Sequence, residues 1–138
     1  MHRIVVVFLA FTICSAAFTP MARAADPPAD RVVVMYFHRT ERCPTCLKMG
    51  SYAEEAVNKG FAEQVQSGSV AFHYIDFQDR KNAAFAKAYK VSGPALVIVK
   101  VADNKVEQYK NLQDIWGKVR EKPEFLKYVQ TNIQEYLQ

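Results

Sequence analysis

The sequence is short of cysteine and has no apolar run of membrane-spanning length, and each shortage excludes a class of protein. Only three of its 138 residues are cysteines, and there is no second Cys-x-x-Cys pair of the kind that four-ligand zinc sites commonly use. The longest apolar stretch, residues 4–18, is nearly unbroken over 15 residues, whereas a membrane-spanning helix needs about 20. Neither a structural zinc site nor a membrane span in the mature chain is therefore expected.

Other motifs that the sequence lacks argue against several classes of cofactor and partner. No basic stripe with interleaved aromatic residues is present, so nucleic-acid binding has little support. The sequence carries no fingerprint of a flavin or nicotinamide site. Covalent haem attachment needs a histidine directly after the second cysteine of the pair, and Leu47 stands there instead. We therefore expect a protein without a cofactor.

The first 24 residues have the pattern of a secretory signal peptide. His2 and Arg3 form a short basic start, the apolar run follows, and Ala22 and Ala24 supply small residues where a signal peptidase reads them. Cleavage is expected after Ala24, which gives an exported, periplasmic or extracellular protein. An uncleaved N-terminal anchor is the alternative.

The rest of the chain is predicted to be a linker over residues 25–30 followed by one domain over 31–138. Loss of the two leader arginines lowers the formal net charge from +4 to +2, which indicates no particular partner. The mature chain keeps two cysteines, because Cys14 leaves with the leader. No sequence feature indicates the oligomeric state.

The two remaining cysteines, Cys43 and Cys46, stand as Cys-Pro-Thr-Cys at the start of a predicted helix. A disulfide between them would close a very small loop and constrain the unfolded chain little, so the spacing favours a bond that is made and broken. A thiol at a helix N-terminus faces unpaired N–H groups and the positive end of the helix dipole. Arg42 adds a positive charge directly before Cys43. Both effects favour the thiolate, the reactive form in disulfide exchange.

Hydrophobic patterns and turn residues predict an α/β fold with a mixed central sheet, helices on both faces and the order β-α-β-α-β-β-α. Strands are predicted over residues 31–37, 70–76, 95–101 and 105–110. Helices are predicted from 44 to 66 with a break at Gly60, over 79–89, and over 112–137 with interruptions near Gly117 and Pro123.

This order resembles the thioredoxin-like fold over nearly the whole mature chain, with Cys-x-x-Cys opening the first helix and Pro94 opening the third strand. The segment from Tyr36-Phe37-His38 to Arg42-Cys43-Pro44-Thr45-Cys46 is also similar to an exported group named as a subunit of nitrophenyl-compound nitroreductase. The thioredoxin resemblance implies that Cys43 attacks and that Cys46 resolves. It also implies that Pro94 follows a cis peptide bond and faces the cysteines.

The sequence departs from thioredoxins in ways that bear on the chemistry. Arg42 stands where they have tryptophan, and residues 34–37 offer no buried acid. Glu41 or His38 would have to serve as the base. His38 is either a supporting residue of the site or a strand-end histidine satisfied by the backbone, and the second is favoured. Trp116 is expected to be a packing residue.

These features predict an exported thiol–disulfide oxidoreductase whose partners are protein or small-molecule thiols and disulfides. The expected catalytic residues are Cys43 and Cys46, with Pro94, Arg42 and His38 in supporting positions. The alternative is a thioredoxin-like module without enzymatic activity. Such a module would bind a soft metal such as Cu(I) through the thiols, with His38 as a third ligand, or dock to a partner.

Overall fold

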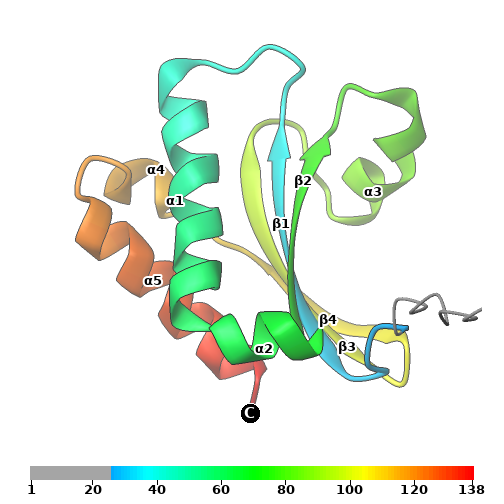
Figure 1. Ribbon diagram of the computed structural model, residues 1–138. Helices are drawn as coiled ribbons and strands as arrows, with labels where there is room; N and C mark the ends of the chain where they lie inside the picture. Colours follow the sequence, from blue (N-terminus) through cyan, green and yellow to red (C-terminus); the bar gives the residue numbers. More distant parts are fainter. Residues whose placement is uncertain (1–25) are drawn as a thin grey trace, which may run out of the picture.

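A four-stranded mixed sheet forms the centre of the structure, a computed structural model that describes residues 26–138 (Figure 1). The predicted signal peptide and Cys14 lie outside the described residues. The strands are β1 (Arg31–His38), β2 (Val70–Asp76), β3 (Ala95–Ala102) and β4 (Lys105–Asn111). Their spatial order is β2-β1-β3-β4, with β2 parallel to β1, and β3 antiparallel to both β1 and β4. The first strand is therefore central, which fits its nearly continuous apolar sequence.

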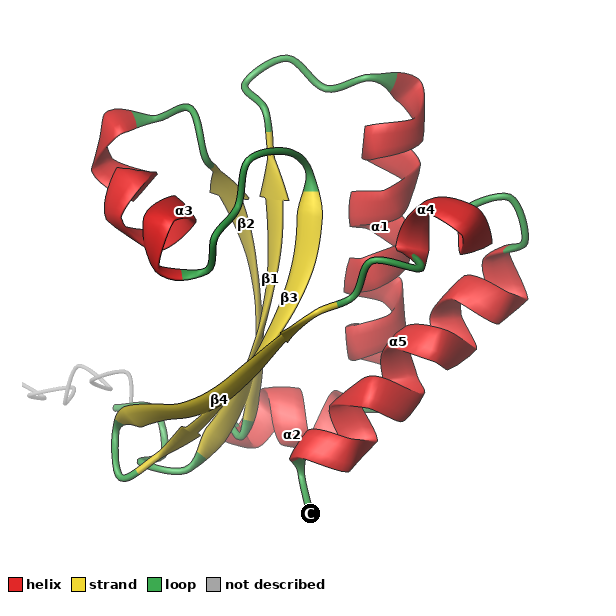
Figure 2. Cartoon of the chain, turned by 180° about the vertical axis from the view of Figure 1, so that it is seen from behind, coloured by secondary structure: helices red, strands yellow, loops and turns green. Residues whose placement is uncertain are grey.

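The helices lie on both faces of this sheet, as Figure 2 shows from behind. Helices α1 (Pro44–Gly60), α4 (Ile115–Lys118) and α5 (Lys122–Tyr136) cover one face, and α2 (Ala62–Ser67) continues the chain beyond the end of α1. The other face carries a 3-10 turn (Arg80–Asn82) and α3 (Ala83–Ala88). The predicted α/β fold is confirmed, and its strand order and directions are those of a thioredoxin-like fold.

Strand alternation divides the core into two clusters. On β1, Val32, Val34 and Tyr36 point toward α1 and α5, where Phe125 and other apolar side chains of α5 are buried. Met35 and its neighbours on the alternate positions point to the α3 face. Each fully buried side chain of this size contributes about 1.5–3 kcal/mol to folding.

The helix on the α3 face is shorter than predicted. The sequence predicts one helix over residues 79–89, which would place Phe85 and Tyr89 on the same face. The structure instead has a 3-10 turn followed by six helical residues, Ala83–Ala88. Tyr89 is buried against Phe37, but Phe85 is about half exposed. The helix ends at Ala88, and Tyr89 is its C-cap residue.

The hairpin between β3 and β4 turns at Asp103 and Asn104, between the strands predicted over 95–101 and 105–110. Both residues have positive φ, 49° and 60°, as the two central residues of a type I′ hairpin turn do. The segment before β1 is hydrogen-bonded to this turn: Asn104 N–H donates to Ala29 O at 3.0 Å, and Asp103 N–H donates to Asp30 Oδ1 at 2.9 Å. Within residues 26–138, no helix is both long and apolar enough to cross a membrane.

Helix α1 approaches the sheet closely at Gly50. A Cβ on this residue would lie 2.9 Å from Cε1 of Tyr36 and 2.9 Å from Cε1 of Tyr74. Tyr36 is fully buried, so its ring has no room to retreat. Glycine at this position therefore sets the distance between the first turns of α1 and the end of β1.

We expect Gly50→Ala to lower the free energy of unfolding by about 1–2 kcal/mol. Overpacking costs about 1–3 kcal/mol, and the better helix propensity of alanine returns up to about 1 kcal/mol. Denaturant unfolding measures the change. Gly117→Ala is the matched control: it also lies in a helix, nothing stands within 4 Å of the added Cβ, and it should not destabilise. A Gly50→Ala protein as stable as this control would contradict the close approach.

Candidate functional site

Cys43 and Cys46 are joined by a disulfide at the start of helix α1. Their Cα atoms are 5.0 Å apart. Cys43 is the N-cap residue, and its Sγ accepts the N–H of Cys46 at 3.1 Å. Pro44 follows as the first helical residue, where its missing N–H leaves no hydrogen bond unmade. The geometry places one sulfur at the positive end of the helix dipole.

The two sulfurs differ in access. The Cys43 side chain is exposed, whereas Cys46 is 7 % exposed and packs one turn into the helix. An approaching thiol or disulfide therefore meets Cys43 first. This is the arrangement that an attacking and a resolving thiol require.

Tyr36 on strand β1 holds the start of helix α1 in place from the side of the sheet. Sequence analysis did not select this residue. Its hydroxyl donates to Cys46 O at 2.8 Å. Burial raises the pKa of Tyr36 to about 12, against the opposing effect of the positive charge on Arg42. The phenol therefore remains a hydrogen-bond donor at neutral pH and is no base for the thiols.

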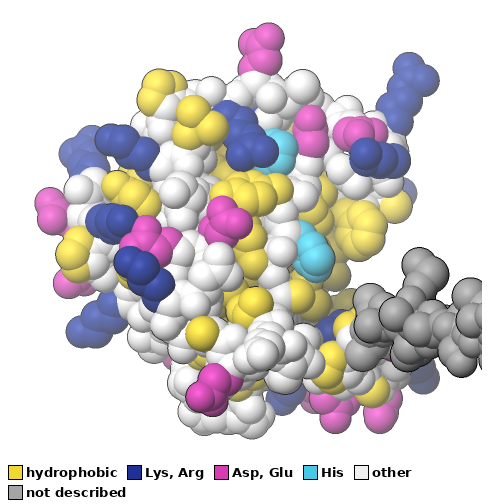
Figure 3. All heavy atoms as spheres, viewed as in Figure 1, with side chains coloured by type: hydrophobic (Ala, Val, Ile, Leu, Met, Phe, Trp, Pro, Cys, Tyr) yellow, Lys and Arg dark blue, Asp and Glu magenta, His cyan; other side chains and the backbone are white. Residues whose placement is uncertain are grey.

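Arg42 turns back toward the sheet. Its guanidinium donates to His38 Nε2 at 3.0 Å and lies 4.9 Å from the centre of the Tyr74 ring. The Tyr74 hydroxyl donates to Glu54 Oε2 at 2.9 Å. Burial, followed by this bond to a carboxylate, raises the pKa of Tyr74 to about 12. On the same side of the molecule, hydrophobic side chains reach the surface between α1 and β2, beside basic and histidine side chains (Figure 3).

His38 is a buried strand-end residue, and the backbone satisfies only one of its two ring nitrogens. Its Nδ1 is 2.8 Å from Arg39 O, and its Nε2 receives Arg42. Both ring nitrogens are therefore occupied within its own loop, and neither is available as a base or a metal ligand. Glu41, the other candidate base, is exposed.

The polar groups around His38 are likewise engaged. Asp76 lies opposite His38 in the parallel pairing of β1 with β2. Its carboxylate accepts from the Thr40 hydroxyl at 2.7 Å and from the Gln78 N–H at 2.9 Å. The Thr40 hydrogen bond is the main reason that the pKa of Asp76 lies below its ordinary value.

The prediction of a cis peptide bond before Pro94 is wrong. The Gly93–Pro94 bond is trans, since residues 26–138 contain no cis peptide bond. Trans is the preferred isomer of an X–Pro bond by about 0.5–1 kcal/mol. Pro94 still lies at the expected end of the sheet, because the next residue, Ala95, pairs with Phe37.

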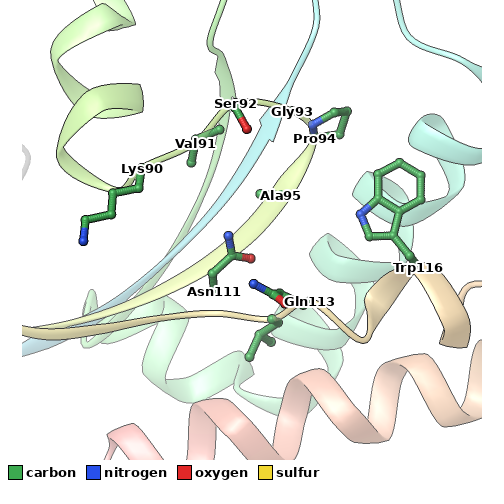
Figure 4. A pocket seen from close by; sticks show the side chains of 10 residues that line it. Lys90, Val91, Ser92, Gly93, Pro94, Ala95, Asn111, Gln113 and Trp116 are labelled. Atoms are coloured by element: carbon green, nitrogen blue, oxygen red, sulfur yellow. The ribbon is translucent and has the colours of Figure 1, made fainter.

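A groove of about 550 Å³ lies beside Pro94 (Figure 4). It is bounded by the loop from Lys90 to Ala95 and by residues 111–113, and the Trp116 ring stands at the end away from Lys90. Trp116 is 47 % exposed, so its expected role as a packing residue is wrong. Burial depends on where α4 docks, which the sequence alone did not indicate. The residues lining the groove include neither cysteine.

The described part of the chain holds no group of three or more His, Cys, Asp and Glu side chains placed to bind a metal ion. A third ligand for the two thiols would have to come from His38. That ring already has both nitrogens in hydrogen bonds.

Comparisons with known proteins give little beyond this geometry. No protein-family profile and no curated protein sequence matches the chain. Among solved structures, the chain is similar to a thioredoxin from Thermus thermophilus, with 23 % identity, a TM-score of 0.44, and coverage of 74 % of this chain and 73 % of that one. We therefore assign the fold from the strand order and directions. The similarity to the nitrophenyl-compound nitroreductase group has no support here.

After reduction, we expect iodoacetamide to modify Cys43 at least about tenfold faster than Cys46 at pH 7. Each unit by which a thiol pKa is lowered gives up to tenfold more thiolate, and burial of Cys46 adds to the difference. Mass spectrometry of the two single variants, Cys43→Ser and Cys46→Ser, measures the rates. Equal rates, or faster modification of Cys46, would contradict the assignment of the accessible thiol.

Proposed function

We propose that this chain is an exported thiol–disulfide oxidoreductase. The observation that carries the proposal is the pair of unlike sulfurs, one an exposed helix N-cap and the other buried one turn inside, in a thioredoxin-like fold. A structural disulfide gains most when it closes a long loop. This one spans three residues and stabilises the fold little, which supports a redox role.

The reaction exchanges two electrons and requires no further group. The Cys43 thiolate attacks one sulfur of a partner disulfide, forms a mixed disulfide and releases the other partner sulfur as a thiolate. Cys46, after losing its proton, attacks Cys43 Sγ. The Cys43–Cys46 disulfide re-forms, and the second partner thiolate leaves. The partner is reduced and the protein is oxidised; the reverse sequence oxidises a partner dithiol.

The groove beside Pro94 and Trp116 is the proposed binding site for the partner thiol or disulfide. It opens at the end of the sheet where β1 leads into the cysteine loop. Backbone groups of residues 93–95 and the exposed indole ring offer hydrogen bonds and an apolar surface to an extended thiol-bearing chain. Protein or small-molecule thiols and disulfides are the substrate class.

Export is supported by the signal-peptide pattern of residues 1–24, which lies outside the described residues. Disulfide chemistry of this kind operates in oxidising compartments such as the periplasm. We expect the protein isolated after expression with its full leader to begin at Ala25. N-terminal peptide mapping by mass spectrometry tests this. A chain that keeps residues 1–24 and sediments with membranes would instead support the uncleaved anchor.

In the proposed mechanism, Cys46→Ser should accumulate a mixed disulfide with a model disulfide substrate, and Cys43→Ser should not. Without Cys46, the intermediate on Cys43 cannot be resolved. Non-reducing electrophoresis and mass spectrometry measure the adduct. An adduct that forms only through Cys46 would reverse the two roles.

The rival is a module without turnover that holds a soft metal through its thiols, which suit Cu(I). The wild-type protein separates the two functions. Catalytic exchange of a model disulfide supports the oxidoreductase. Failure to exchange, together with stoichiometric retention of copper by the reduced protein, supports the metal-binding module.

A further inference from the structure

His38 and Arg42 form a contact beside the disulfide that the exchange steps do not use directly. His38 is 7 % exposed and ends strand β1, where the loop leading to Cys43 begins. Its two hydrogen bonds fix its protonation. Arg39 O only accepts, so Nδ1 carries the proton; the Arg42 guanidinium only donates, so Nε2 presents a lone pair. The ring in this arrangement is therefore neutral, with one tautomer selected.

Arg42 is held from a second direction by Tyr74. The guanidinium lies over the ring at 4.9 Å, a cation–π contact. Tyr74 is itself fixed, because its hydroxyl bonds to Glu54 and its ring makes edge contacts with Tyr36 and with His38. The arginine is thereby confined between an imidazole acceptor and an aromatic face.

Neither of these partners neutralises the guanidinium. Of the ion pairs among residues 26–138, none includes Arg42. The carboxylates of Asp76 and Glu54 accept hydrogen bonds from Thr40, Gln78 and Tyr74, and neither forms an ion pair with Arg42. A carboxylate in the place of His38 would orient the arginine equally well, but it would cancel its charge. A neutral imidazole orients the charge and leaves it intact.

The charge also reaches the first turn of α1. The positive charge of Arg42 opposes the burial that raises the pKa of the Tyr36 hydroxyl. That hydroxyl is 2.8 Å from Cys46 O, within the disulfide loop. Arg42 is also the residue directly before Cys43, so its guanidinium belongs to the side chain next to the attacking thiol in the sequence.

We propose that His38 is a positioning residue which, with Tyr74, holds the unneutralised Arg42 guanidinium where its charge favours the Cys43 thiolate. This inference rests on the proposed exchange reaction, because it concerns the acidity of the attacking thiol. His38 acts only through Arg42. Loss of His38 should therefore matter when Arg42 is present and be silent when it is absent.

A double-mutant cycle in the Cys46→Ser background of the full chain tests this. The Cys43 pKa is taken from the pH dependence of its alkylation by iodoacetamide, followed by mass spectrometry of the Cys43 peptide. Arg42→Gln should raise that pKa by about one unit, the lower end of the effect of an opposite charge at close range. Arg39→Gln, with the same change of charge in the same loop, is the control and should shift it by less than about 0.3 units.

The His38 variants separate positioning from mere support of the fold. His38→Asn keeps a donor for Arg39 O but is too short to accept from Arg42, and should raise the Cys43 pKa by nearly as much as Arg42→Gln. His38→Gln places an oxygen near the position of Nε2. The Cys43 pKa of this variant should lie within about 0.3 units of its value in the protein that keeps His38. In an Arg42→Gln protein, His38→Asn should cause no further rise. Circular dichroism and thermal unfolding check that each variant is folded.

An unchanged Cys43 pKa in Arg42→Gln overturns the proposal, and so does an effect of His38→Asn that persists without Arg42. Arg42→Gln alters a partly exposed loop side chain, so it provides a decisive measurement even if a His38 variant fails to fold. The alkylation needs no partner disulfide. A protein with the expected pKa pattern that fails to exchange disulfides would contradict the proposed function and leave the positioning role intact.

Discussion

The hydrogen bond from Tyr36 to the carbonyl of Cys46 is the contact on which the geometry of the site depends. It joins the central strand to the first turn of α1 at 2.8 Å, in a place where nothing larger than Gly50 fits between helix and ring. The helix start, and with it the sulfur of Cys43, is thereby placed relative to the sheet by a fully buried side chain. The loop from Arg39 to Arg42 only has to connect two ends that are already fixed.

The same packing limits which side chains could accept the proton of the Cys46 thiol. Thioredoxins carry a buried acid near the resolving cysteine, but in this chain the neighbouring polar groups are a phenol with a pKa of about 12 and an imidazole with no free nitrogen. Neither has an acceptor to offer the proton of Cys46. In the proposed exchange reaction, electrostatic stabilisation of the thiolates by the helix terminus and by Arg42 would therefore contribute more than proton transfer through a side chain.

Much of the fold could be predicted from sequence because its signals are local. The valine-rich first strand, the Asp103-Asn104 turn and the proline-started last helix each depend on residues next to one another. The Cys-Pro-Thr-Cys pair was likewise visible at once. Features that depend on docking were not. Trp116 was expected to be packed and is about half exposed, because its burial depends on where α4 docks.

The supporting residues show the same division. Pro94 was correctly placed at the start of the third strand, but its peptide bond depends on the shape of a loop and is trans. His38 and Arg42 were both selected as single residues, and a contact between the two was not considered. Their contact with one another requires the chain to turn back after β1. The role of Tyr74 required the register of β1 against β2, in which it pairs with Tyr36.

The direction in which β1 runs determines where the disulfide lies relative to a tether at the N-terminal side of the domain. Ala29 and Asp30 are bonded to the β3–β4 turn, at the end of the sheet where β1 begins, whereas the disulfide follows the other end of β1 (Figure 1). Eight extended residues separate the two ends, a span of about 25 Å. If the chain were attached to a support ahead of residue 26, the disulfide would lie at the opposite end of the domain from the attachment point. It would therefore face away from the support and stay accessible to partners.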